Sequence, residues 1–395
     1  MGSCAGRRAR GDRPRVELAE VVRAHADDLG DLSREQSHAL EAIANCRTAA
    51  LGGHLHVCDS CDYKAQSYNS CRNRHCPKCG GLGELAWVDA READVLPIEY
   101  FHLVFTISNK LHELFLCNKK LAYNLLFAAV SETLQEVALT NLGARLGFTA
   151  ILHSWTQTLL YHPHVHCIIA GGGLDPSGTR WISFPNHFFV AVRKLSLVFR
   201  GKLLEKLRGA LDRGDLFAAD YKTADKALRQ SARKKWYVYC KPSLLGPGNI
   251  LRYLGRYTHR IGISNERLRG FHDGLVDFYI KDRNNDNRQI PVTLPAVKFL
   301  RRFLLHILPT GFMRVRHYGF LSNSSRSKTL PLCRAALGIP QPPARSKETW
   351  RELLLRTTGQ DPTRCPHCED GHLKVTQTLE PIAPKWALPG RASSP

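Results

Sequence analysis

The sequence predicts an α+β protein in which a small cysteine-rich domain precedes a larger domain of strands and helices. Two observations support this class. Residues 46–83 are rich in cysteine, histidine, glycine and asparagine and have little apolar periodicity, so they cannot build a hydrophobic core of their own. From Ile98 onward, apolar runs of strand length and amphipathic helical patterns follow one another. We expect domains over residues 1–95 and 96–325, and a partly ordered tail rich in proline and arginine over 326–395.

The predicted elements follow in chain order. Residues 13–29 have a helical apolar pattern, and a second helix begins at Ser33 with the spacing of a capping box. The apolar run 98–107 predicts a buried strand, and residues 108–139 predict one long helix. The other expected elements are strands at 151–160, 162–170 and 234–241, helices at 191–211, from about Asn249, and at 295–308, and a hairpin at 275–294.

The chain is strongly basic. It has 395 residues, with 56 Lys and Arg against 35 Asp and Glu, a formal charge of +21. Residues 191–260 contain seventeen basic and five acidic side chains. Such an excess favours a phosphate-rich partner and predicts salt-sensitive binding. No apolar run approaches the roughly 18–20 residues that span a bilayer, and the first fifteen residues lack a signal-peptide core. We therefore expect a cytoplasmic, nucleoid-associated protein.

Two CxxC pairs, Cys58/Cys61 and Cys76/Cys79, are separated by fourteen residues, a spacing typical of a four-thiolate zinc site. Four protein ligands leave no open coordination position, so the zinc would be structural. Reduced thiols without metal are the alternative. A second zinc ion or an exchanged ligand set is open for neighbouring residues, namely Cys46, His54, Cys71 and His75. The pair Cys365/Cys368 supplies only half a tetrahedral site, and it is the weaker candidate.

Three histidines alternate along one predicted strand. His162, His164 and His166 have a spacing of two, which places their imidazoles on one face. His153 and Gln157 share a face of the preceding strand, and an antiparallel pairing would bring either of them near the same metal ion. A row of surface or core histidines without metal is the alternative interpretation.

Two tyrosines, Tyr253 and Tyr257, are four residues apart and hence on one face of a predicted helix. Packing alone explains most such pairs. Beside a metal site, however, a phenol can attack a phosphate whose developing charge is stabilised by the ion and by guanidinium groups. The resulting tyrosyl–DNA ester retains the phosphodiester energy, and the sequence contains no GxxxxGK[ST] motif for ATP.

Three blocks carry a family resemblance: YNSCRNRHCPKCG at 68–80, HSWTQTLLYHPHVHCIIAGGG at 153–173 and YLGRYTHRIGISN at 253–265, with RHYGFL at 316–321 in support. They resemble the HUH single-strand endonucleases, most closely the rolling-circle transposases of the insertion-sequence-91 family. The resemblance implies an N-terminal zinc-binding domain, with its cluster at about 46–83, and a catalytic domain with a central antiparallel sheet flanked by helices.

The resemblance also implies residue roles. The histidine pair corresponds to His164 and His166, and the nucleophiles correspond to Tyr253 and Tyr257. Gln157 is our first choice for a third ligand, and His153 is the second. Mg²⁺ or Mn²⁺ is the implied ion, and imidazole ligands suit Mn²⁺ better. One tyrosine would cut single-stranded DNA, leaving a 5′-phosphotyrosine and a free 3′-OH, and the other would support strand transfer.

The expected partner is single-stranded DNA at the element ends and the target, and the sequence leaves the oligomeric state open. We expect the basic stretch 191–260 to line its path, with Trp236, Tyr237 and Tyr239 stacking on bases or simply packing in a strand. The basic side chains expected to contact DNA are Arg72, Arg74, Lys78, Arg252, Arg256, Arg260, Arg314 and Arg316.

Two other functions fit part of this pattern. A non-catalytic zinc-finger DNA-binding protein, such as a degenerate transposase, would share the charge and the cysteines but would not need the histidines and both tyrosines together. A zinc hydrolase could use the histidine strand, but the sequence offers no HExxH motif and no obvious acidic general base near it.

Overall fold

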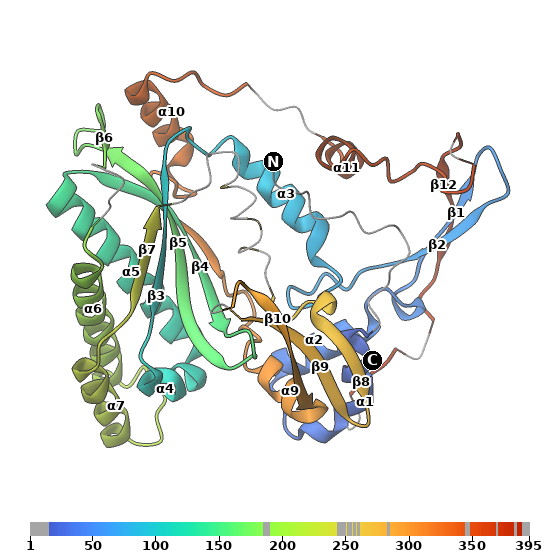
Figure 1. Cartoon of the computed structure of the whole chain (residues 1–395), viewed down its shortest axis with the longest axis horizontal. Coiled ribbons are helices and arrows are strands. Elements are labelled where there is room, and N and C mark those ends of the chain that lie inside the picture. The colour runs from blue at the N-terminus through green and yellow to red at the C-terminus, as the bar shows by residue number, and fades with distance from the viewer. Residues whose placement is uncertain are drawn as a thin grey trace.

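The computed structural model describes residues 16–184, 190–242, 261–282, 285–343, 348–368, 370–382 and 385–388, together with Ile250, Gly255 and Thr258. Figure 1 shows a body built around a large sheet, a second body of helices and a small sheet, and a third small sheet that pairs residues 53–68 with residues 373–379. The predicted α+β class is confirmed. No helix in the described ranges combines the length and apolar character that crossing a membrane requires.

The large sheet is antiparallel throughout and has the strand order β11-β4-β5-β3-β7, with β6 paired to one end of β5. The sequence predicted β3 and β5 near their observed positions, whereas the strand expected at 151–160 lies at 145–155 as β4. The bounds of the strands are β3 Tyr100–Thr106, β4 Arg145–Trp155, β5 Tyr161–Leu174, β6 Trp181–Ser183, β7 Val238–Pro242 and β11 Val315–Gly319.

Helices cover one face of this sheet. α4 (His112–Cys117), α5 (Lys119–Leu142), α6 (Val192–Asp212) and α7 (Tyr221–Arg233) lie on that side (Figure 1). Alternate residues of β3, such as Phe101 and Phe105, enter the core beneath them, and Phe105 packs edge-on against Phe199 of α6 at 5.0 Å. The opposite face of β3 carries His102, Val104 and Thr106, which are only partly buried.

The helix expected over 108–139 is interrupted. Asn118 has a non-helical backbone (φ −126°, ψ 35°) between α4 and α5, and its side-chain amide donates to the carbonyl groups of Leu114 and Phe217. This amide bonds to backbone groups on two segments, a pairing that competes with helical continuity. The break could not be read from apolar residues, because both helices bury residues in the same core.

The second body has its own core. It is formed by α1 (Leu18–His25), α2 (Arg34–Asn45), α9 (Ala296–Leu304) and the sheet β10-β9-β8, whose strands span Leu268–His272, Leu275–Asp282 and Arg288–Pro295 from β8 to β10. The capping box predicted at Ser33 is present. This core joins the N-terminal helices to residues 263–307, which the sequence analysis assigned to different domains.

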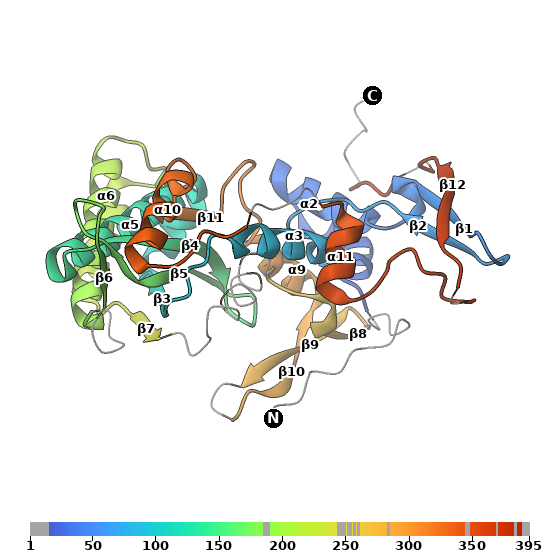
Figure 2. The same ribbon diagram turned by 90° about the horizontal axis from the view of Figure 1, so that it is seen from above.

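The C-terminal segment returns to the N-terminal part of the chain. After α10 (Arg326–Leu337), α11 (Trp350–Thr358) lies beside α3 (Gly80–Glu92), as Figures 1 and 2 show. β12 (Leu373–Leu379) then adds to β1 (Gly53–Cys58), which also pairs with β2 (Lys64–Tyr68). In its described ranges, the segment expected to be a partly ordered tail thus contains two helices and the edge strand of a three-stranded sheet.

We predict that Phe299→Ala lowers the free energy of unfolding of the second body by about 3–5 kcal/mol, the usual effect of removing a buried aromatic ring. Phe299 is fully buried, and its ring centroid lies 5.6 Å from that of Phe278. Urea denaturation followed by circular dichroism measures the change. Phe217→Ala is the control, because Phe217 is 71% exposed; equal losses in both variants would contradict the assignment of this core.

Candidate metal centre and adjoining groove

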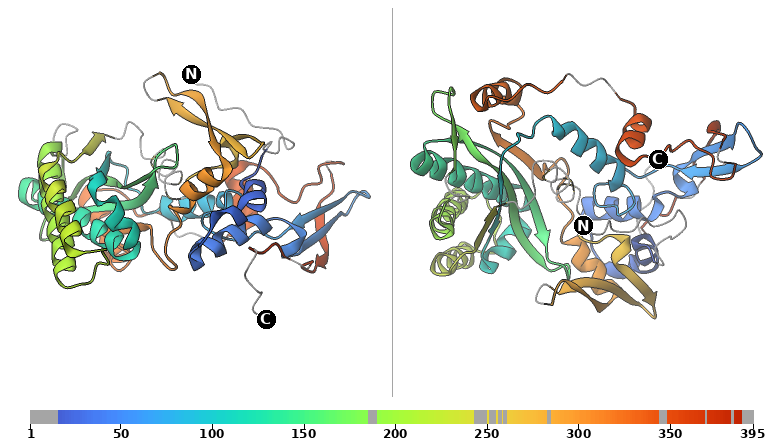
Figure 3. Two further views of the ribbon diagram at one scale, coloured as in Figure 1. Left: turned by 90° about the horizontal axis from the view of Figure 1, so that it is seen from below. Right: turned by 45° about the horizontal axis from the view of Figure 1, so that its top comes forward.

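Three histidines converge on the face of the large sheet opposite α4–α7, the side on which α3 lies (Figures 1 and 3). His153 and His166 are buried there. Antiparallel pairing places His153 of β4 directly opposite His164 of β5, and His166 lies two residues further along β5. Their ring centroids are 4.7–5.7 Å apart, and one nitrogen from each ring lies within 4.8 Å of the others. These donor atoms can therefore bind one metal ion.

Hydrogen bonds set the tautomer of His164. Its Nδ1 lies 2.6 Å from the carbonyl oxygen of His162. A carbonyl can only accept, so Nδ1 carries the proton and Nε2 carries the lone pair that a metal requires. The indole of Trp155 stacks on the ring of His153 at 4.8 Å and fixes its plane.

His102 of β3 is part of this site, although the sequence analysis did not single it out. Its Nε2 lies 2.9 Å from Nδ1 of His166, and the two rings are nearly parallel. Burial lowers the pKa of His102 to about 4, so its imidazole is neutral near pH 7. A neutral His102 orients His166 and directs the Nε2 of His166 toward the cluster, as second partners of metal-binding histidines do.

Gln157, our first choice for the third ligand, is used elsewhere. It lies beyond the end of β4, and both atoms of its amide pair with the backbone of Lys281, at 2.9 and 2.7 Å. His153, the second choice, lies in the cluster. His162 does not join the three: its ring lies beside those of His164 and His112.

The second body holds the turn between β4 and β5. Leu159 is fully buried in its core despite a positive φ of 60°, and Arg302 donates to the carbonyl of Thr158. His306 bridges Ser154 and the carbonyl of Leu159 at 3.1 and 3.0 Å. Burial lowers the pKa of His306 to about 4, so this bridge is neutral at pH 7.

The cysteines form two four-sulfur clusters with a grouping different from the expected one. In the first cysteine cluster, Cys76 and Cys79 lie with Cys46 and Cys71. In the second cluster, Cys58 and Cys61 lie with the C-terminal pair Cys365 and Cys368. The described cysteines are all free thiols. The prediction that the two N-terminal CxxC pairs share one ion is therefore corrected. Sequence spacing could not reveal the exchange. The partners come from the end of α2 and the loop after β2 in one cluster, and from residues 365–368 in the other.

The two histidines named as further zinc ligands are outside both clusters. His75 pairs with Asn73 and accepts from the backbone N–H of Leu308, and burial together with nearby arginines lowers its pKa to about 3. His54 lies in β1, where its ring is beside that of His56.

A groove of about 1040 Å³ begins at the first cysteine cluster and runs past the N-terminus of α3 to the start of β11. Five basic side chains line it, whereas Glu84 is the single acidic residue among its described lining residues. The basic residues are Arg72, Arg74, Arg267, Lys281 and Arg314. The groove has the charge expected of a phosphate-binding surface.

Several residues expected to contact DNA have structural partners. Arg74 donates to the carbonyl of Phe312, Lys78 pairs with Glu17, and Arg314 donates to the carbonyl of Thr258. Burial and the neighbouring Arg74 lower the pKa of Arg314 to about 10. Arg316 lies over the ring of Phe127 at 4.2 Å on the helix-covered side, so the structure does not place it in the groove.

The basic helix α6 lies on the sheet face opposite the histidines, which contradicts the expectation that residues 191–260 line the DNA path throughout. Its Lys202 and Lys206 pair with Glu136 and Glu132 of α5. Just before β7, Trp236 is buried and Tyr237 is 69% exposed, and on β7 Tyr239 is 46% exposed. Those two phenol rings remain candidates for base stacking.

Tyr253, Tyr257 and the arginines Arg252, Arg256 and Arg260 lie outside the described residues. Two residues between them are described. A Cβ at Gly255 would meet Val88 of α3 at 2.4 Å, and Thr258 lines the groove beside Arg314.

Comparison with known proteins places the chain. A family model described as "Putative transposase" matches residues 147–328, and one described as "Transposase zinc-binding domain" matches residues 18–107. The "Putative transposase y4qJ" of Sinorhizobium fredii is 42% identical over 382 residues, covering 93% of this chain and 96% of that protein. The chain is a transposase of the insertion-sequence-91 family.

A more distant relative agrees. The transposase for insertion sequence element IS801 of Pseudomonas savastanoi is 27% identical over 351 residues, covering 87% of this transposase and 84% of that protein. Among solved structures, the conjugative relaxase TrwC in complex with OriT DNA matches 41% of this chain and 71% of its own, with 15% identity and a TM-score of 0.24.

We predict that His153→Ala weakens Mn²⁺ binding by more than about 100-fold, because it removes one of three ligands. His102→Phe removes only an orienting partner and should cost about 10- to 100-fold. Calorimetric titration of the purified transposase with Mn²⁺ measures both. Gln157→Ala is the matched control, expected to change affinity less than about threefold. A larger loss for Gln157→Ala than for His153→Ala would reverse our choice of ligand.

Proposed function

We propose that this transposase cleaves and rejoins single-stranded DNA through a covalent tyrosine–DNA intermediate, with a divalent ion at the histidine cluster. The observation that carries the proposal is the convergence of His153, His164 and His166 on the sheet face opposite α4–α7. A protein that only binds DNA needs no such cluster, and this distinguishes the proposal from a zinc-finger regulator.

The donor set suits Mn²⁺ or another transition ion better than Mg²⁺, since all three ligands are imidazoles. When bound, such an ion supplies positive charge beside the scissile phosphate. The chain's own residues prepare the site: Trp155 and His102 orient two of the ligands, and the carbonyl of His162 fixes the tautomer of His164.

Tyr253 and Tyr257 are the proposed nucleophiles. The phenolic oxygen of one attacks the phosphorus and loses its proton, while the bond from phosphorus to the 3′ oxygen breaks and that oxygen gains a proton. A 5′-phosphotyrosine and a free 3′-OH result. Attack by a 3′-OH on this ester reverses the bond changes, so joining needs no nucleotide triphosphate.

The groove is the proposed path of the DNA strand. It links the first cysteine cluster, through Arg72 and Lys281, to Thr258, which immediately follows Tyr257 in the sequence. A zinc ion at Cys46, Cys71, Cys76 and Cys79 would fix the loop that carries Arg72. A metal there would be structural, and an ion held by the histidines would have the chemical role.

We predict a covalent adduct between the full-length transposase and an oligonucleotide that carries an authentic element end. With Mn²⁺, a 3′-labelled strand should migrate with the denatured protein, because the downstream fragment stays on tyrosine, whereas a 5′ label should be released. The double variant Tyr253→Phe/Tyr257→Phe should form no adduct. Persistence of the adduct in that variant would exclude these tyrosines as the nucleophiles.

Two further variants divide the roles. His164→Ala should abolish the adduct while DNA affinity changes by less than about threefold. Cys76→Ser should weaken folding or DNA binding instead, because it breaks the first cysteine cluster. Equal loss of both activities in the two variants would contradict this division.

We also predict that Arg72→Ala and Lys281→Ala each reduce the slope of log affinity against log salt by about 0.7, the value for one phosphate contact to a single strand. Fluorescence anisotropy with labelled single-stranded DNA at several salt concentrations measures it. Arg180→Ala is the control, since Arg180 is 80% exposed and is not among the residues that line the groove. An unchanged slope in the two groove variants would place the strand elsewhere.

A further inference from the structure

We propose that the transposase binds a second structural zinc ion through Cys58, Cys61, Cys365 and Cys368, and that this ion fastens the C-terminal segment to the N-terminal domain. The family model for the zinc-binding domain ends at residue 107, so it contains only half of this ligand set. The other half lies about 300 residues later in the chain.

The sulfur distances fit a tetrahedral ion. Cys58 Sγ lies 3.6 Å from Cys368 Sγ, and Cys61 Sγ lies 3.8 Å from Cys365 Sγ. A zinc ion with Zn–S bonds of about 2.3 Å separates its sulfurs by about 3.8 Å. A disulfide would bring a pair to about 2.05 Å. The four thiols are therefore arranged around a central point and not as two bonds.

Both CxxC turns have the same local structure. In the first, the backbone N–H of Ser60 points to Cys58 Sγ at 3.4 Å, and in the second the N–H of His367 points to Cys365 Sγ at the same distance. Such N–H groups stabilise the negative charge of metal-bound thiolates. The ring of His367 stacks on Tyr63, so this imidazole packs beside the cluster.

Two hydrogen bonds between Asp59 and His372 join the two turns. The N–H of His372 donates to the Asp59 carboxylate at 2.7 Å, and the N–H of Asp59 donates to the carbonyl of His372 at 3.1 Å. A Cβ at Gly371 would lie 2.4 Å from Cys58 Sγ, so only glycine fits this close approach. The two CxxC turns therefore lie on one three-stranded sheet, β12-β1-β2. This is the arrangement of a zinc ribbon, assembled here from two segments that are far apart in the sequence.

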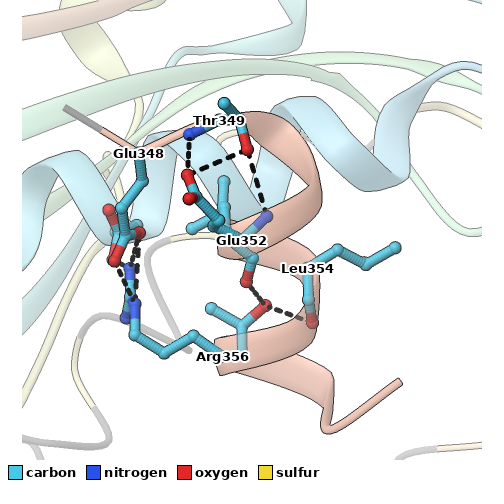
Figure 4. A network of polar contacts seen from close by, with 8 residues as sticks. Glu348, Thr349, Glu352, Leu354 and Arg356 are labelled. Atoms are coloured by element: carbon cyan, nitrogen blue, oxygen red, sulfur yellow. Dashed lines mark hydrogen bonds and ion pairs between the residues drawn. The ribbon is translucent and has the colours of Figure 1, made fainter. Parts of the chain in front are cut away.

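Hydrophobic burial contributes little to the stability of this three-stranded sheet. The five central residues of β12 are all exposed, and β2 has no buried residue. α11 buries none of its residues either. Figure 4 shows that the contacts on α11 are polar: Arg356 pairs with Glu348, and Thr349 and Glu352 form a capping box. Arg356 also reaches Asp89 of α3.

Exposed ion pairs of this kind contribute at most about 1 kcal/mol each. A small sheet without a core needs a staple such as a structural metal. The second cluster supplies it, because Cys58 and Cys365 are the buried residues at its centre. Zinc binding then keeps α11 beside α3, the helix whose N-terminal residues line the groove.

Zinc content of the intact transposase tests the proposal. Mass spectrometry of the metal in purified protein should give two zinc ions per chain for the wild type and one for Cys365→Ser/Cys368→Ser. Cys117→Ser should retain two, because Cys117 is exposed and belongs to neither cluster. The measurement contains no DNA, so its outcome is separate from that of the nicking experiments.

Thiol alkylation of the native wild-type protein keeps the test independent of whether a variant folds. The four cysteines of the second cluster should react at least about tenfold more slowly than Cys117, and a zinc chelator should abolish their protection. One zinc ion per chain, with Cys365 and Cys368 alkylated as fast as Cys117, would overturn the proposal. In the double variant, hydrogen exchange should rise in β12 and remain unchanged in β4 and β5.

Discussion

The antiparallel register of β4 and β5 is the constraint on which the candidate metal centre depends. It places His153 opposite His164, with His166 two residues further along the same face. Because side chains alternate along a strand, a shift of one residue would turn the histidines toward the helices and expose Val165 and Cys167. The packed core beneath the sheet, in which both residues are fully buried, therefore specifies the metal site on its other face.

Contacts with the second body stabilise this register of β4 and β5. Leu159, at the tip of the turn between the two strands, is buried in its core, and His306 bonds to both sides of the turn. Burial lowers the pKa of His306 below that of the unfolded chain. Its contribution to stability is thus full above about pH 6.5 and is lost as the pH falls toward 4. This support of the turn should therefore weaken in acid.

Sequence reasoning identified the local features well and the long-range partners poorly. Period two predicted the shared face of His164 and His166, and the capping box predicted the start of α2 at Ser33. Gln157 stays a prediction that local spacing could not refine, because β4 ends at Trp155 and the amide of Gln157 pairs with the distant backbone of Lys281. Sequence analysis missed His102 because no local feature of β3 indicates that this strand pairs with β5.

The cysteines show the same limit more sharply. Each CxxC pair is a local signal, but it specifies only half of a tetrahedral site, and the other half depends on the fold. Cys46 from the end of α2 and Cys71 from the loop after β2 complete the site of Cys76 and Cys79. The core of the second body brings these segments together. The two pairs at 58–61 and 365–368 complete each other only after β12 has joined β1. The groove therefore lies between one cluster that forms within the N-terminal segment and a helix, α3, that is flanked by α11 from the C-terminal segment. It follows that the shape of this surface depends on contacts made by residues that are about 270 positions apart in the sequence.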